Sequence, residues 1–76
     1  MHTATQPRLV AKTHQVVISE HPSKKAAEAA LDVIVKRFTK TIVAQGVDEA
    51  TITTSRDLTV SGQADLVISC TTRYAA

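Results

Sequence analysis

The stretch His21–Gly46, HPSKKAAEAALDVIVKRFTKTIVAQG, is the one segment of the chain with a regular helical pattern and recognisable ends. Its apolar residues recur at intervals of three and four, as Ala27, Ala30, Leu31, Ile34, Val35, Phe38 and Ile42. That spacing places them in one stripe along an α-helix. Pro22 suits the first helical position, with His21 or Ser23 as the cap, and Gly46 suits a helix end with positive φ. The stretch therefore predicts a long amphipathic helix whose apolar stripe the rest of the chain must cover.

The segments around this helix have the composition of strands. Residues 8–19 (RLVAKTHQVVIS) lack helical spacing and are β-branched toward their end, and residues 50–60 (ATITTSRDLTV) are rich in Thr and Ile. Residues 64–74 alternate most regularly, which makes them the clearest strand. Residues 61–63 form the turn, where Gly62 is free to take a positive φ. We expect Val60 to face Ala64 across this three-residue loop, so that even-numbered residues share the inner face and Arg56 is the misfit there unless a bulge re-aims it.

This order of elements predicts an α+β fold, a β-α-β-β two-layer sandwich. Because the helix separates the first strand from the second, the first strand is expected beside the last. The result is a three-stranded antiparallel sheet of order 1-3-2 with one long helix packed across one face. Residues 1–7 are expected to form a disordered N-terminal arm, and residues 8–76 a single β-α-β-β domain. In its core we expect Leu31, Ile34 and Phe38 to be buried against Leu66 and Ile68.

In its architecture, this order of one strand, one helix and two strands resembles the dodecins and the small YdgH-like bacterial proteins. The resemblance implies the same helix-on-sheet fold. Dodecins stack a flavin on tryptophan, which this chain lacks, so the resemblance implies no flavin cofactor. YdgH-like proteins are normally exported, whereas residues 1–7 lack the basic start and apolar middle of a signal peptide. No functional residue carries over from either family.

Length and charge narrow the classes of function. A 76-residue chain is near the size at which a single core is marginally sufficient, and self-association would bury more surface. The net charge of +2 is uneven, because residues 1–45 hold seven Lys/Arg against three Asp/Glu and the remainder is acidic. No apolar run approaches the ~20 residues of a membrane span. Cys70 is the only cysteine, which agrees with a reducing, cytoplasmic setting.

The sequence offers little chemistry for catalysis or for a cofactor. With two glycines, the chain has no Gly-rich phosphate loop, and no Cys/His cluster has the spacing of metal ligands. An extended chain would hold His14 and His21 about 20 Å apart, so we expect surface or link histidines. Cys70 alternates with inward-facing residues and is expected to be a buried, unreactive thiol. We therefore expect no enzyme, no cofactor and no metal.

Two surfaces remain as candidate sites. The first is a basic patch on the helix, which phosphates could bind: Lys24, Lys25, Lys36, Arg37 and Lys40. The second is a hydroxyl-rich outer sheet face on which a second sheet could dock: Thr51, Thr53, Val67, Ser69, Thr71 and Arg73. The favoured function is a small non-enzymatic binding or assembly protein that acts through protein contacts as a homo-oligomer. A basic-helix adaptor or phage-type inhibitor for nucleic acid or its machinery is the alternative. An enzyme with a site between subunits is third.

Overall fold

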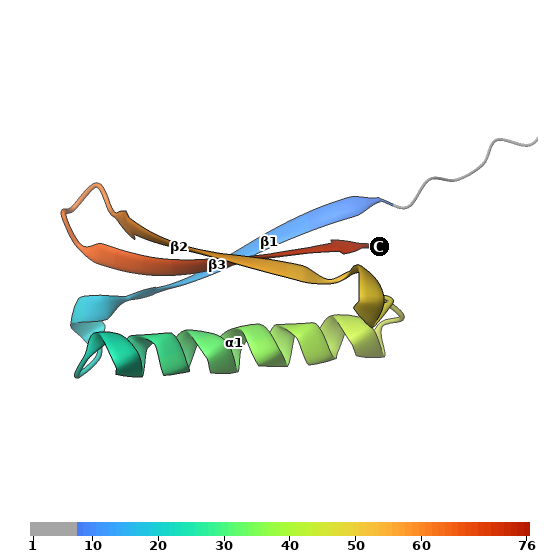
Figure 1. The fold of residues 1–76 in the computed structure, drawn as a ribbon, viewed down its shortest axis with the longest axis horizontal. Helices are drawn as coiled ribbons and strands as arrows, with labels where there is room; N and C mark the ends of the chain where they lie inside the picture. Colours follow the sequence, from blue (N-terminus) through green and yellow to red (C-terminus); the bar gives the residue numbers. More distant parts are fainter. Residues whose placement is uncertain (1–7) are drawn as a thin grey trace, which may run out of the picture.

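The computed structural model describes residues 8–76, so the expected arm of residues 1–7 lies outside the described residues. The strands are β1 (Leu9–Val17), β2 (Thr53–Val60) and β3 (Leu66–Ala75), and the long helix is α1 (Lys24–Ala44). Two short 3-10 turns, η1 (Ile18–Glu20) and η2 (Glu49–Thr51), lead into α1 and β2. The sheet forms one layer and α1 the other (Figure 1). The predicted α+β fold with sheet order 1-3-2 is confirmed.

Local chemistry sets the two ends of α1. The Ser23 side chain accepts a hydrogen bond from the Ala26 N–H at 3.1 Å and is the N-cap. Pro22 therefore lies before the cap, and its prediction as the first helical residue is wrong. At the other end Gly46 has a φ of +104°, which glycine adopts without steric cost. Gly46 is thus the predicted stop, just beyond the C-cap Gln45.

The sheet is antiparallel throughout, with β3 in the centre. β1 pairs with β3 from Leu9↔Ala75 to Val17↔Val67, and β2 pairs with β3 from Thr53↔Arg73 to Val60↔Leu66. The predicted parity of the hairpin is confirmed, but its register is shifted by two residues, since Val60 faces Leu66 rather than Ala64. The pairing of β2 is continuous, so no bulge re-aims Arg56.

The hairpin loop is longer than predicted because its own hydrogen bonds hold residues 61–65. The Ser61 hydroxyl accepts from the N–H groups of Gln63 and Asp65, and the Ser61 N–H donates to the Asp65 carbonyl at 2.8 Å. Ala64, not Gly62, takes the positive φ in this loop, at 63°. That conformation costs an L-residue about 1–2 kcal/mol.

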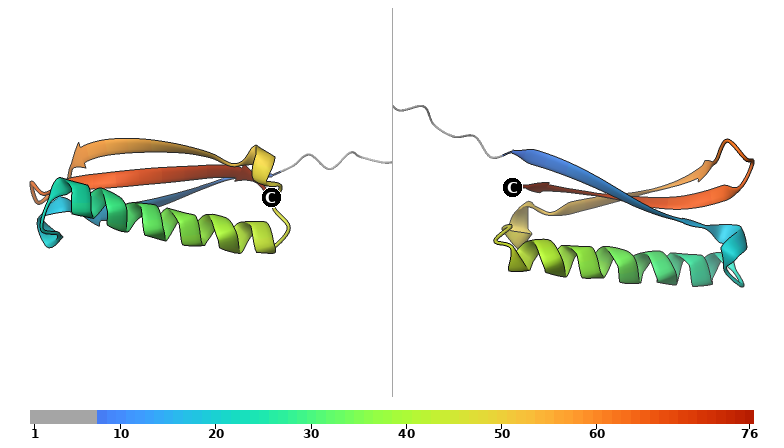
Figure 2. Two further views of the ribbon diagram at one scale, coloured as in Figure 1. Left: turned by 60° about the horizontal axis from the view of Figure 1, so that its bottom comes forward. Right: turned by 180° about the vertical axis from the view of Figure 1, so that it is seen from behind.

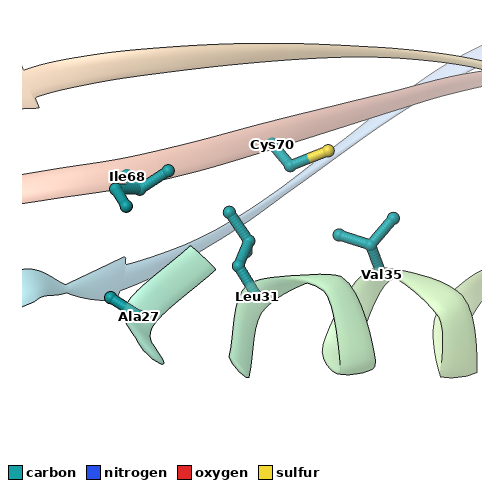
Figure 3. Packing of buried hydrophobic residues seen from close by; sticks show 5 residues of the cluster. All are labelled: Ala27, Leu31, Val35, Ile68 and Cys70. Carbon is teal, nitrogen blue, oxygen red and sulfur yellow. The ribbon is translucent and has the colours of Figure 1, made fainter. Parts of the chain in front are cut away.

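The core lies between α1 and the paired strands β1 and β3. Ala27, Leu31 and Val35 of the helix pack against Ile68 and Cys70, and Figure 3 shows Leu31 pointing toward the strand that carries both. Val16 and Ile18 complete this cluster. The predicted burial of Leu31, Ile68 and Cys70 is confirmed.

Three other core predictions fare differently. Ile34 is 39% exposed and Leu66 47% exposed, so both predictions of burial are wrong, and Phe38 is only partly buried. Ile34 lies at the margin of the apolar stripe, beside the buried helix residues Ala27, Leu31, Val35 and Ile42. Leu66 is on the inner face of the sheet but at the hairpin end of β3, where its neighbour is Val60 of the exposed strand β2.

The position of the helix over the sheet explains these differences. α1 packs on β1 and β3, whereas all eight residues of β2 are exposed. The left view of Figure 2 shows β2 along the side of the sheet away from the helix. A helix is about 10 Å across with its side chains and strands are about 4.8 Å apart, so one helix covers about two strands. The third strand is left without a cover.

Candidate functional site

The outer face of the sheet, predicted as an interface, is a layer of side chains that bond to one another. The Thr13 and Thr71 hydroxyls are 2.8 Å apart, and Arg73 donates to the Ser55 hydroxyl at 3.0 Å. The Ser69 hydroxyl donates a hydrogen bond to the Asp57 backbone carbonyl at 3.5 Å. These bonds satisfy much of the polar surface within one copy, so the face has less need of a partner.

Two members of that predicted interface are placed differently from expectation. Val67 faces outward by its register, yet it is 5% exposed, because it lies on the central strand between Val17 and Thr59. Its prediction as an exposed apolar contact is wrong. Thr51 belongs to η2 rather than to a strand, and its hydroxyl donates to the Asp48 carbonyl and accepts from the Ala75 N–H. Thr53, Ser69, Thr71 and Arg73 share the outer face as predicted.

The basic patch of the helix divides into two parts. Lys36, Arg37 and Lys40 lie around one shallow hollow together with the exposed Val33 and Val43. Lys24 instead lines a separate hollow between the first turns of α1 and β2, and Lys25 is exposed in the same first turns. The structure therefore brings three of the five predicted cations together. Their surface combines this positive charge with two valines and the carboxylate of Glu49.

The side of β2 that faces the helix layer is the largest feature that sequence reasoning missed. Leu58 is 51% exposed and Val60 65% exposed, although their register places them on the same face as the core residues Ile68 and Cys70. Arg56 stands on that face too and forms an ion pair with Asp32 of α1. Both side chains of the pair are about half exposed, so this bond holds β2 to the helix only weakly.

The sequence contained one signal for this uncovered side. Arg56 belongs to the inward-facing set of β2, and a cation is seldom buried without a partner. Asp32 stands four residues before Lys36 on the helix, but its ion-pair partner is Arg56. Had Arg56 been weighed as evidence that this part of the inner face is open to solvent, Leu58 and Val60 would have been predicted as exposed.

A small aromatic cluster lies under the helix at the other edge. Phe38 packs between His14 and Tyr74, with ring centroids 4.9 Å and 5.9 Å apart. His14 is thus partly buried, and its prediction as a surface histidine is wrong; its Nδ1 is buried and has no hydrogen-bond partner. His14 lies opposite Cys70 on β3, but the thiol is 1% exposed. A nucleophile must reach its substrate, so this Cys–His pair is a packing contact.

Within residues 8–76, no group of three or more His, Cys, Asp or Glu side chains is placed to hold a metal ion. In the same part of the chain, no helix has the length and apolar character needed to cross a membrane. Comparison of the chain with protein-family models, curated proteins and solved structures found no match. The candidate sites therefore stand on geometry alone.

Proposed function

We propose that this chain is a small, non-enzymatic assembly protein that associates with further copies of itself through the uncovered side of β2. The single observation that carries the proposal is the exposure of Leu58, Val60 and Leu66 on the face of the sheet that elsewhere forms the core. Exposed neighbouring apolar side chains beside the free edge of a sheet are typical of association surfaces. We also propose a reducing, cytoplasmic setting, because the single cysteine, Cys70, has no second cysteine in this sequence to pair with.

The thin core supports the same proposal. Among residues 8–76, seven large hydrophobic side chains are exposed, which is as many as the hydrophobic residues of the core itself. A chain of this size has little stability to spare. Association would bury part of the exposed apolar surface and add to that stability by mass action.

Sedimentation velocity over a hundredfold range of protein concentration tests the proposal. We expect the wild type to sediment faster as concentration rises, and Leu58→Lys to remain monomeric, because a charge there opposes burial. Two variants serve as matched controls: Thr71→Lys on the outer sheet face, and the triple change of Lys36, Arg37 and Lys40 to Gln. Both should associate like the wild type. A wild type that is monomeric at every concentration would contradict the proposal.

The basic helix face supports a second candidate function, binding to nucleic acid. Lys36, Arg37 and Lys40 share one exposed surface, and the ion pair shown among residues 8–76 involves none of them. Phosphate binding by these cations would release counterions, so its affinity should fall steeply with salt. Fluorescence anisotropy of a labelled oligonucleotide at several salt concentrations measures this, with the triple Gln variant as the control. Equal binding by wild type and variant would exclude this surface.

A further inference from the structure

The free edge of β2 presents a defined set of backbone groups. The Ser61 N–H bonds to the Asp65 carbonyl, and these two residues continue the β2–β3 register beyond Val60↔Leu66. Hydrogen-bonded and non-hydrogen-bonded pairs alternate along an antiparallel ladder. The odd-numbered residues of β2 therefore bond to β3. Arg56, Leu58 and Val60 turn their N–H and C=O groups to the free edge.

We propose that two copies pair β2 against β2 in antiparallel register, with Leu58 opposite Leu58 of the second copy. This proposal rests on the proposed function and adds to it the partner strand and its register. The two three-stranded sheets become one continuous six-stranded sheet around a two-fold axis. Such an isologous contact closes on itself, so it gives a dimer rather than a fibre.

Symmetry and charge select this register. A two-fold axis perpendicular to the sheet keeps each copy's faces on the same side, so one residue of β2 must lie opposite itself. Centring the pairing on Arg56 or on Asp57 would place like charges directly opposite each other, which is unfavourable. Centring it on Ser55 would leave Leu58 and Val60 beyond the paired Thr53–Asp57 segment. Centring it on Thr59 would pair only residues 58–60 before β2 ends at Val60. The register centred on Leu58 pairs residues 56–60 without opposing charges, and it places the two exposed leucines side by side.

The backbone groups fit this register. Leu58 would exchange two hydrogen bonds with its symmetry mate, and Arg56 would exchange two with Val60 of the second copy at each end. These three residues turn their backbone N–H and C=O groups to the free edge of β2, as the pairing requires. On the outer face Asp57 would lie opposite Thr59, which carries no charge. The pairing thus satisfies edge groups that otherwise bond to water.

The arrangement also leaves the charges of the helix in water. Both helices stand on the same side of the joined sheet, and the strand spacing places their axes about 19 Å apart, roughly twice the distance of packed helices. The ion pair of Arg56 draws its guanidinium toward Asp32 of its own helix, away from the seam. A five-residue seam buries less than the roughly 800 Å² per partner of a standard interface. We therefore expect a reversible equilibrium between monomer and dimer that depends on protein concentration.

Cysteine crosslinking tests the register. In the Leu58→Cys variant, the two thiols would be directly opposite across a hydrogen-bonded pair, with Cα atoms about 5.5 Å apart, within reach of a disulfide. With oxidised glutathione as the oxidant, we expect most of this variant to become a disulfide-linked dimer. Thr54→Cys lies on the same strand and face but beyond the seam, and it should stay largely unlinked. The wild type, whose Cys70 is buried, gives the background, and circular dichroism checks the fold of each variant.

The outcomes separate the pairing from the function. A linked Leu58→Cys dimer with unlinked Thr54→Cys supports the proposed register. A wild type that associates in sedimentation, with crosslinking at Arg56→Cys or Thr54→Cys instead of Leu58→Cys, would overturn the register and leave the proposed function standing. A wild type that is monomeric by sedimentation, with no crosslinking at residue 58, would overturn both.

Discussion

The two edge strands, β1 and β2, pair with β3 in the same way but differ in how far their side chains are buried. Both are antiparallel to β3 and pair with it along their whole length. Val16 of β1 packs into the core and His14 is partly buried under Phe38, whereas every residue of β2 is exposed. Pairing alone therefore makes a strand but does not bury it. The position of the helix decides which strand contributes to the core.

The two free edges also differ in how they would meet another chain. β1 carries the exposed Lys12 near its middle, and an edge lysine hinders the approach of a further strand. On β2 the only cation, Arg56, is drawn to Asp32 of the helix. The face of β2 next to Arg56 is apolar, at Leu58 and Val60. The uncovered strand is thus also the less protected one.

The largest effect is expected when a leucine is truncated to alanine in the covered core and on the uncovered strand β2. Leu31 is fully buried under β1 and β3, so Leu31→Ala should lower the free energy of unfolding by about 3–5 kcal/mol. Leu58→Ala should lower it by less than about 1 kcal/mol in the monomer, since half of that side chain is already in water. Urea denaturation of dilute protein measures both changes. Equal losses would mean that β2 is covered.

A cross-strand pair of threonines gives a smaller effect of opposite sign. Thr72 is 0% exposed and its hydroxyl is buried without a hydrogen-bond partner, while its neighbour Thr54 on β2 is exposed. Thr72→Val removes an unsatisfied polar group at nearly constant volume, so it should raise the free energy of unfolding by about 1–2 kcal/mol. Thr54→Val should change it by less than about 0.5 kcal/mol. Thermal unfolding of both variants checks this, and destabilisation by Thr72→Val would reveal a bond to that hydroxyl.

The smallest effect is expected at the ion pair between β2 and the helix. Arg56→Gln should lower the free energy of unfolding by less than about 0.5 kcal/mol, because both partners are about half exposed and screened by water. Once Arg56→Gln has broken the pair, adding Asp32→Asn should cause no further loss in the free energy of unfolding. Chemical denaturation at low and high salt measures the coupling. A loss several times larger would show that the pair, rather than β3, holds β2 in place.

Much of the fold could be predicted because it depends on short-range patterns. The three- and four-residue spacing from Ala27 to Ile42 locates the helix, and the alternation from Leu66 to Tyr74 locates the central strand. Strand order 1-3-2 follows once the helix separates the first strand from the hairpin. The loop of residues 61–65 could not be read in the same way, because side-chain bonds from Ser61 lengthen it by two residues. Parity survived that shift, since two residues return every side chain to the same face.

The candidate site was harder to predict than the fold. The basic residues and the outer hydroxyls were identified from the sequence, and helical spacing already places Lys36 and Lys40 together. Only the structure shows that Lys24 lines a separate hollow and that Thr71 and Arg73 bond within their own face. Leu58 and Val60 were assigned to the inner face correctly. Which part of that face the helix covers could not be predicted from the sequence.

The sequence by itself determined which residues form the helix and strands, which strand is central, and which side of each strand faces inward. Those properties depend on periodicity and chain connectivity, and both are local or topological. Only the tertiary structure decided where along the width of the sheet the helix rests. That choice depends on the fit of Ala27, Leu31 and Val35 against Ile68 and Cys70, a contact between distant segments. Because one helix is about as wide as two strands, resting on β1 and β3 leaves β2 without a cover.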